Sequence, residues 1–313
     1  MEYIKLKNSD ITVSRLCMGG CPMGGYGWGN VQETELIDAV HTALDNGITF
    51  FDTADTYGLG QSEITLGKAL GSHRKDAVIA SKFGVRVMNG KTVYDNSPQW
   101  IREALEASLK RLGTDYIDLY QVHYRDGVTP IGEVVETLEA LKEKGLIRAF
   151  GLSNLYLKDA EELKDYENKF VSFQNEYSLA CRKYENDILS LSQDYNMTPL
   201  TWGSLGQGIL TGKYDKTAVF GADDRRSRDI YVNFHGEKLL HNLEIVEVMR
   251  GIAEKHEKPV SAVALRFILD YLPESVVICG IKRPKQALDN ILGSDWKLSE
   301  CEIKELTEIS NID

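Results

Sequence analysis

The sequence predicts a closed parallel β-barrel surrounded by helices, the (β/α)₈ or TIM-barrel fold class. Eight short apolar segments alternate with amphipathic helical patterns along the chain. The 313 residues suffice for one such barrel, which takes about 250 residues. Right-handed crossovers close eight strand–helix units into a barrel more readily than into another arrangement, and an open doubly wound sheet is the alternative. We therefore expect a single domain over residues 1–313.

Each predicted strand is short and ends in a polar residue or glycine, which is typical of a strand buried on both faces. Before the first of them, residues 3–6 and 11–14 predict a β-hairpin that caps the bottom of the barrel. The eight barrel strands are expected at Leu16–Gly20, Ile48–Asp52, Val78–Lys82, Ile117–Gln121, Ala149–Ser153, Phe170–Gln174, Thr198–Trp202 and Val276–Gly280.

Apolar residues recur at helical spacing in three segments between the strands, at 36–44, 101–112 and 131–141. Ser97 and Thr129 each precede a proline, so each is predicted to cap the helix that follows. After the seventh strand, residues 212–235 show no clear periodicity, which predicts a long lid loop.

The charge balance and the cysteines exclude several classes of protein. The 36 basic and 47 acidic side chains give a net charge of −11, which disfavours binding to nucleic acid. The five cysteines are odd in number and form no C-x-x-C pair, so we expect reduced thiols and no metal site. The N-terminus has no signal-peptide pattern, and no apolar run approaches the ~18 residues of a membrane span. We expect a cytoplasmic protein with no membrane contact, and leave its oligomeric state open.

Four polar residues lie at or just after the ends of predicted strands. Asp52 and Lys82 end the second and third strands, whereas Tyr57 and His123 lie in the loops after the second and fourth. Strand ends of a parallel barrel meet on one rim, where the sites of such barrels lie. A phenol can donate a proton to a carbonyl oxygen, a nearby ammonium lowers the phenol pKa, and a carboxylate keeps the ammonium charged. The set therefore favours carbonyl reduction, with His123 aligning the substrate and a cofactor supplying the hydride.

Three segments of the chain resemble the signatures of the aldo-keto reductase family. They are residues 51–58 with Ser62 and Glu63, residues 80–82, and residues 115–119 continuing to His123. The resemblance covers nearly the whole chain. The chain is similar to the branch of the family that contains the potassium-channel β subunits, although those proteins differ at the position of His123. The resemblance implies a (β/α)₈ barrel in which Asp52, Tyr57, Lys82 and His123 form the catalytic tetrad.

The sequence has no G-x-G-x-x-G between a strand and a helix, which argues against a Rossmann-type site. The resemblance instead implies NADP(H) extended across the barrel mouth, with amide contacts after strands five and six and a pyrophosphate loop after strand seven. The basic segment around Lys282 and Arg283 favours a 2′-phosphate. The expected cofactor residues are Gly19, Gly20, Asp52, Ser153, Asn154, Gln174, Trp202, Gly203, Ser204, Leu205, Gln207, Gly208, Lys213, Arg228, Gly280, Lys282, Arg283, Gln286, Asp289 and Asn290.

The leading hypothesis is NADPH-dependent reduction of an aldehyde or ketone, with Tyr57 as general acid. The expected contacts to this small-molecule carbonyl substrate are Tyr57, His123, Tyr26 and Trp28. Three alternatives remain open: oxidation of a sugar or alcohol by the reverse reaction, a Schiff-base lyase with Lys82 as nucleophile, and a slow NADPH-binding regulatory subunit.

Overall fold

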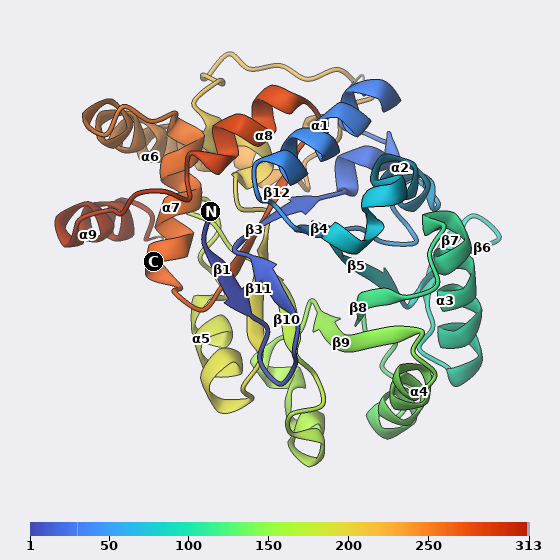
Figure 1. The fold of residues 1–313 in the computed structure, drawn as a ribbon. Helices are drawn as coiled ribbons and strands as arrows, with labels where there is room; N and C mark the ends of the chain where they lie inside the picture. The colour runs from blue at the N-terminus through green and yellow to red at the C-terminus, as the bar shows by residue number, and fades with distance from the viewer. Residues whose placement is uncertain (30, 312–313) are drawn as a thin grey trace.

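Eight parallel strands close into a barrel in a computed structural model that describes residues 1–29 and 31–311 (Figure 1). Residues 30, 312 and 313 of the expected domain lie outside the described residues. The neighbours around the barrel are β10, β11, β12, β3, β4, β5, β8 and β9, so the predicted barrel is confirmed and the open sheet is excluded. These strands are β3 (Leu16–Gly19), β4 (Phe50–Asp52), β5 (Val78–Phe83), β8 (Ile117–Val122), β9 (Ile147–Ser153), β10 (Ser172–Glu176), β11 (Thr198–Trp202) and β12 (Val276–Gly280).

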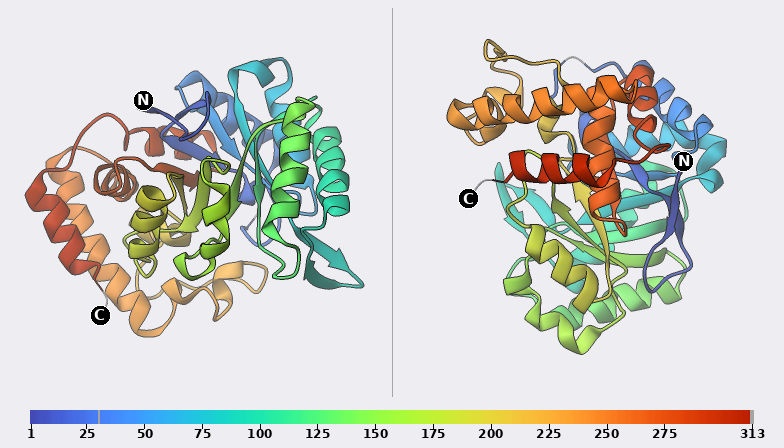
Figure 2. Two further views of the ribbon diagram at one scale, coloured as in Figure 1. Left: turned by 90° about the horizontal axis from the view of Figure 1, so that it is seen from below. Right: turned by 90° about the vertical axis from the view of Figure 1, so that its left-hand side faces the viewer.

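Helices surround the barrel, as the two further views in Figure 2 show. Between β9 and β10 the chain forms two 3₁₀ segments, Leu157–Asp159 and Glu161–Tyr166, in place of an α-helix. The α-helices are α1 (Glu33–Asp45), α2 (Gln61–Leu70), α3 (Pro98–Leu112), α4 (Ile131–Glu143), α5 (Glu185–Asp194), α6 (Gly236–Lys255), α7 (Val260–Tyr271), α8 (Pro284–Ile291) and α9 (Glu300–Ile309).

A β-hairpin closes the amino end of the barrel, as predicted. Its strands are β1 (Tyr3–Lys5) and β2 (Thr12–Ser14). Leu6, Ile11 and Val13 are at most 3% exposed and pack with the residues that fill the barrel interior. The apolar face of the hairpin thus completes the inner core from below.

A second hairpin, β6 (Val85–Met88) with β7 (Lys91–Tyr94), lies beyond β5 and was not predicted. Asn89 and Gly90 connect its strands with φ angles of 52° and 74°. An Asn-Gly pair with both residues at positive φ is the turn that suits the twist of a two-stranded hairpin.

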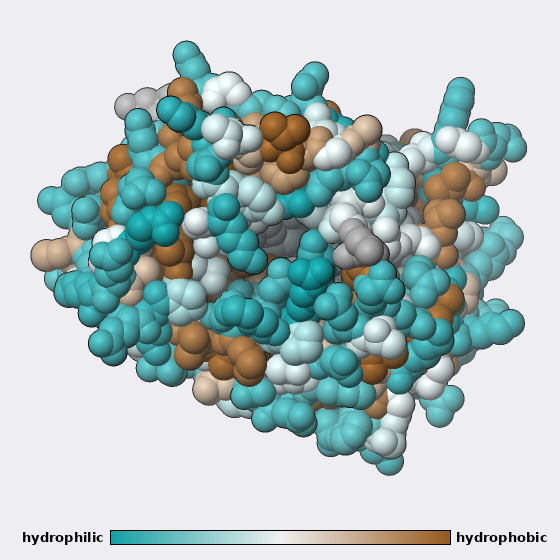
Figure 3. All heavy atoms as spheres, turned by 90° about the horizontal axis from the view of Figure 1, so that it is seen from above, coloured by the Kyte–Doolittle hydropathy of each residue, from teal (hydrophilic) through white to brown (hydrophobic). Residues whose placement is uncertain are grey.

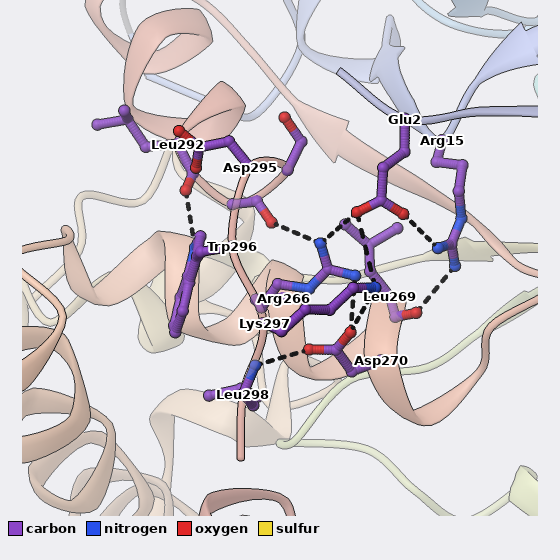
Figure 4. Close-up of polar contacts among 12 residues, drawn as sticks. Glu2, Arg15, Arg266, Leu269, Asp270, Leu292, Asp295, Trp296, Lys297 and Leu298 are labelled. Carbon is purple, nitrogen blue, oxygen red and sulfur yellow. Dashed lines mark hydrogen bonds and ion pairs between the residues drawn. The ribbon is translucent and has the colours of Figure 1, made fainter.

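The first residues of the chain are tied to α7 by buried charges (Figure 4). Arg266 is fully buried and its Nη1 lies 2.6 Å from one carboxylate oxygen of Glu2, while Arg15 Nη1 lies 2.8 Å from the other. Arg15 also donates to the backbone carbonyls of Ser275, Leu269 and Leu272. This network joins segments that are more than 250 residues apart in the sequence.

One of the two predicted helix caps is confirmed. The Ser97 hydroxyl accepts the N–H of Trp100 at the start of α3. The Thr129 cap is wrong, because the N-cap of α4 is Pro130 and the Thr129 hydroxyl donates to Asp126 instead.

The lid, residues 212–235, contains only short 3₁₀ turns, at Arg225–Ser227 and Val232–Phe234, as the missing periodicity predicts. The five cysteines are free thiols. In the part of the chain that the structure describes, no helix has the length and apolar character needed to cross a membrane.

Candidate active site

Three of the four predicted catalytic residues meet at the carboxyl end of β4 and β5. Lys82 is fully buried, and its Nζ donates to both carboxylate oxygens of Asp52 at 2.7 and 2.9 Å. The same ammonium donates to the carbonyl of Thr53 at 3.0 Å and to the Tyr57 hydroxyl oxygen at 3.4 Å. Because Tyr57 accepts this hydrogen bond, its own hydroxyl hydrogen remains available to a further acceptor.

His123 lies against the same phenol, as predicted. Its ring and that of Tyr57 meet edge to face with centroids 5.9 Å apart, and Tyr124 stacks on its other side at 5.0 Å. Burial, and then the charge of Lys82, hold the pKa of His123 well below its usual value. The imidazole is therefore neutral at neutral pH, and its Nδ1 is buried without a partner among the described residues.

The expected direction of the Tyr57 pKa shift is wrong. Burial raises the pKa of Tyr57 well above 10, and the negative charge of Asp52 raises it further. The expectation treated Lys82 as the dominant charge, whereas Asp52 neutralises that ammonium at 2.7 Å. The phenol is therefore held in its protonated form, which is the form a proton donor must have.

Polar side chains at the ends of β9 and β10 form a chain of hydrogen bonds that reaches the Asp52 carboxylate. Gln174 donates to Asp52 Oδ2 at 2.8 Å and thereby lies beside the tetrad. The Ser153 hydroxyl donates to the carbonyl of Gln174, and the Asn154 amide donates to the Ser153 hydroxyl and to the carbonyl of His123. The structure thus brings together the three residues expected at the cofactor amide.

Gln121, near the end of β8, is a residue of the site that was not predicted. Its Nε2 lies 3.4 Å from Asp52 Oδ2, and its Oε1 is buried without a hydrogen-bond partner in the described chain. A polar residue that ends an apolar strand on the inward face is the signal that could have identified it.

The loop after β11 has the backbone shape expected of an anion site. Gly203, Gly206, Gln207 and Gly208 all have positive φ, between 54° and 109°. Successive residues of this kind turn backbone N–H groups into a shared concave surface. Ser204 is buried, and its hydroxyl donates to the carbonyls of Thr201 and Ile278, so its side chain fixes the loop to β11 and β12.

Other expected cofactor residues lie around this loop. Leu205 precedes the 3₁₀ segment of the loop, Trp202 is half-buried beside the inner core, and Gly280 and Lys213 are exposed.

The basic segment leads into α8, as predicted, but its side chains contact protein groups. Lys282 donates to the carbonyl of Trp28 at 2.8 Å, and Gln286 accepts the Lys282 N–H. Arg283 is 60% exposed and pairs with Glu35 at 3.3 Å, and Asp289 pairs with Lys285. Asn290 is buried, and its Nδ2 has no hydrogen-bond partner among the described residues.

Gly19 and Gly20 were expected to let ligands approach the backbone. A Cβ at Gly20 would lie 2.8 Å from the carbonyl oxygen of Asp52 and 2.8 Å from the Ser62 hydroxyl. At Gly19 it would lie 2.9 Å from the side chain of Ile278. Close packing of neighbouring strand ends is therefore sufficient to require both glycines.

The lid lies along the top of the molecule in Figure 1, and the face seen from above is largely hydrophilic and hollowed near its centre (Figure 3). Arg228 of the lid is exposed and donates to the hydroxyl of Tyr26 at 2.8 Å. Trp28 meets Tyr231 of the lid edge to face at 6.2 Å. The two expected substrate residues of the first loop, Tyr26 and Trp28, therefore contact the lid.

The comparisons with known proteins agree with this geometry. A family model described as the aldo/keto reductase family matches residues 15–311. The chain belongs to this family. Aldo/keto reductases are nicotinamide-dependent oxidoreductases that act on carbonyl or alcohol groups, so the chain is an enzyme of this class.

Relatives match over nearly the full chain. Aldo-keto reductase YhdN of Bacillus subtilis is 35% identical over 99% of this chain and 93% of its own. The NADH-specific methylglyoxal reductase of Escherichia coli is 31% identical over 99% of this chain and 98% of its own.

Among solved structures, the glycerol dehydrogenase AKR11B4 from Gluconobacter oxydans has 32% identity and a TM-score of 0.89, covering 98% of this chain and 94% of its own. An aldo-keto reductase from Klebsiella pneumoniae in complex with NADPH has 25% identity and a TM-score of 0.76, covering 99% and 96%.

Proposed function

We propose that this aldo/keto reductase reduces an aldehyde or ketone to the alcohol with NADPH, and that Tyr57 donates the proton. The observation that carries the proposal is the position of Lys82 Nζ, which contacts both oxygens of Asp52 and the hydroxyl oxygen of Tyr57. A phenol, an ammonium and a carboxylate in direct contact form a unit that can release and recover one proton.

The residues at the barrel mouth fit a nicotinamide dinucleotide. Gln174, Ser153 and Asn154 present amide and hydroxyl groups beside Asp52, and these suit a carboxamide. The loop at 203–208 and the N-terminus of α8 suit phosphates. The N–H groups of Gly206 and Gly208 donate to carbonyls within the loop, so the other backbone N–H groups of these two segments would hold the phosphates. The unpartnered Nδ2 of Asn290 is a buried donor that a ligand can satisfy.

The cofactor supplies hydride when bound, and the chain handles the proton and the position of the substrate. His123, neutral because of its low pKa, donates a hydrogen bond to the carbonyl oxygen and aligns it with Tyr57. Tyr57 then transfers its hydroxyl proton to that oxygen. Lys82 stabilises the resulting phenolate, and Asp52 keeps Lys82 charged and in place.

Two further observations support the choice of NADPH, and one relative argues against it. Lys282, Arg283 and Lys213 concentrate positive charge near α8 in a protein of net charge −11, which suits an additional phosphate. One similar structure holds NADPH, whereas the E. coli relative is NADH-specific. The cofactors should therefore be compared directly.

The test is the Tyr57→Phe variant with a reactive aldehyde. We expect kcat to fall about 10³-fold, since general acids contribute about 10² to 10⁴, while NADPH still quenches the protein fluorescence. Tyr3→Phe is the matched control, because Tyr3 is an exposed tyrosine of the hairpin. Full turnover by Tyr57→Phe would refute the assignment of the proton donor.

The reverse reaction is a second candidate, favoured by the similarity to a glycerol dehydrogenase. Tyr57 would then act as a phenolate that accepts the hydroxyl proton of the alcohol and passes it to solvent, with the Lys82 ammonium stabilising that phenolate. Reduction of NADP⁺ in the presence of glycerol measures this direction. A Schiff-base lyase is disfavoured, because two carboxylate oxygens hold Lys82 as an ammonium and a nucleophile must be a free amine.

A further inference from the structure

Arg225 differs from the other arginines of the lid in where its side chain lies. Its backbone N–H donates to the carbonyl of Gly27, and its guanidinium carbon lies 5.0 Å from the ring centroid of Tyr26 and 5.8 Å from that of Trp28. The side chain passes directly over Gly27, where an added Cβ would overlap it. The first loop of the barrel is therefore built around this arginine.

The Arg225 guanidinium has no anionic partner among residues 1–29 and 31–311. Both carboxylate oxygens of the preceding residue, Asp224, accept hydrogen bonds from Arg226, at 2.9 and 2.5 Å. Arg226 also contacts the Tyr214 hydroxyl, and Arg228 contacts that of Tyr26, but the Nε of Arg225 is buried without a hydrogen-bond partner. A buried donor of this kind is costly unless a ligand satisfies it.

The Arg225 charge lies close to the reacting groups. Burial, and after it the charge of Asp52, raise the pKa of Tyr57, and the Arg225 charge opposes this rise. Burial likewise raises the pKa of the Cys21 thiol, again opposed by Arg225. The geometry agrees, because the first loop that Arg225 covers at Gly27 also packs against Tyr57: a Cβ added at Gly24 would lie 2.6 Å from the Tyr57 backbone.

Aromatic rings over a guanidinium leave its N–H groups free, because these lie in the plane of the group. A planar carboxylate is the partner that this arrangement of donors matches best. We propose that Arg225 is a substrate-binding residue for a carboxylate, so that the substrates of this reductase are carbonyl compounds bearing a carboxylate. The inference rests on the proposed function, since it concerns the substrate side of the same site.

The experiment compares 4-carboxybenzaldehyde with its neutral methyl ester in the wild type, Arg225→Gln and Lys216→Gln. Lys216 is an exposed lysine of the same lid and serves as the charge-matched control. We expect the wild type and Lys216→Gln to prefer the acid. In Arg225→Gln, the acid-to-ester ratio of kcat/KM should fall about tenfold or more, because only the acid carries the group that Arg225 binds.

Binding without turnover separates this inference from the proposed function. By calorimetry in the presence of NADP⁺, we expect benzoate to bind the wild type at least tenfold more tightly than it binds Arg225→Gln, and methyl benzoate to bind both equally. These results would support the carboxylate site even if neither aldehyde were reduced. Equal binding of benzoate to both proteins, or an unchanged ratio together with weaker NADP⁺ binding, would overturn it and assign Arg225 to the cofactor.

Discussion

The two ends of the barrel both bury charge, but they surround it with different groups. At the amino end, hydrogen bonds and the charges of Arg266 and Arg15 hold the pKa of Glu2 below its usual value, although burial acts to raise it. The carboxylate of Glu2 is thus paired with two guanidinium groups. At the carboxyl end, the Lys82–Asp52 pair contacts Tyr57 and lies near His123, and burial holds both of these neutral.

The comparison separates two uses of a buried ion pair. Fixed charges that are paired with each other join distant segments, and removal of one partner leaves the other buried and unpaired. A fixed pair beside neutral groups that can exchange protons provides a field in which a proton can move.

Lys82→Met should have the largest effect, because it removes the charge that Asp52 and Tyr57 both contact. We expect kcat to fall at least about 10³-fold and the free energy of unfolding to fall by about 3–5 kcal/mol, since Asp52 is left buried and unpaired. Aldehyde reduction and urea unfolding measure the two effects. Lys68→Met, at an exposed lysine of α2, is the control, and a variant retaining a tenth of the activity would contradict the assigned role.

Arg266→Met tests the other end of the barrel. We expect the free energy of unfolding to fall by about 3 kcal/mol, because Glu2 and Asp270 lose a buried partner. The kcat of the folded variant should stay within about twofold, since Arg266 lies in the network at the amino end. Arg102→Met, at an exposed position of α3, is the comparison variant. Loss of activity at unchanged stability would show that the charged network at the amino end serves catalysis and not the stability of the fold.

Asp55→Asn asks whether the carboxyl end also carries a destabilising charge. Burial, and then the charge of Glu63, raise the pKa of Asp55 to about 8. The folded protein therefore binds more protons than the unfolded chain between about pH 4 and pH 8, so the stability of the wild type falls as the pH rises through this range.

The Asn variant has no such carboxyl, so its free energy of unfolding should rise by about 4 kcal/mol relative to the wild type between pH 5 and pH 9, measured by urea unfolding. Asp45→Asn, at an exposed position of α1, is the control. An Asp55→Asn variant with the same pH profile as the wild type would show that this carboxyl is ionised in the folded protein.

Lys282→Gln tests whether the basic segment before α8 binds the cofactor phosphate, separately from the groups that transfer the proton. We expect the Kd for NADPH to rise about tenfold and that for NADH to change less than twofold, because only NADPH carries the 2′-phosphate. Fluorescence titration measures both. Lys285→Gln is the matched control, since Lys285 is 82% exposed in the same segment. An equal loss of affinity for NADPH and NADH would show that Lys282 acts through its contact with the carbonyl of Trp28 instead.

Much of the fold could be predicted because buried parallel strands have a strong local signature. Val276–Gly280 and Thr198–Trp202 match the predicted bounds in full. The missed features depend on tertiary context or on turn chemistry. Thr129 has a capping hydroxyl in the expected place, but Asp126 competes for it. The Asn89–Gly90 pair is a hairpin turn signal that can be read from the sequence, so the second hairpin is predictable from local turn chemistry.

The same distinction applies to the site. The convergence of Asp52, Tyr57 and Lys82 follows from the rule that strand ends share a rim, so the sequence predicted it. The direction of the Tyr57 pKa shift did not follow, because burial and charge pairing are three-dimensional quantities. The place of Arg225 also depends on the path of a long loop without regular periodicity.

The hairpin at the amino end has a consequence for how ligands exchange. Leu6, Ile11 and Val13 close the barrel from below and pack with the side chains that fill its interior, so ligands can reach the tetrad only from the carboxyl end. Whatever reaches Lys82 must enter, and leave, on the side where the lid lies. The floor of the site and its polar rim are therefore built from opposite ends of the barrel, so a change in the hairpin can alter stability without touching the groups that face a ligand.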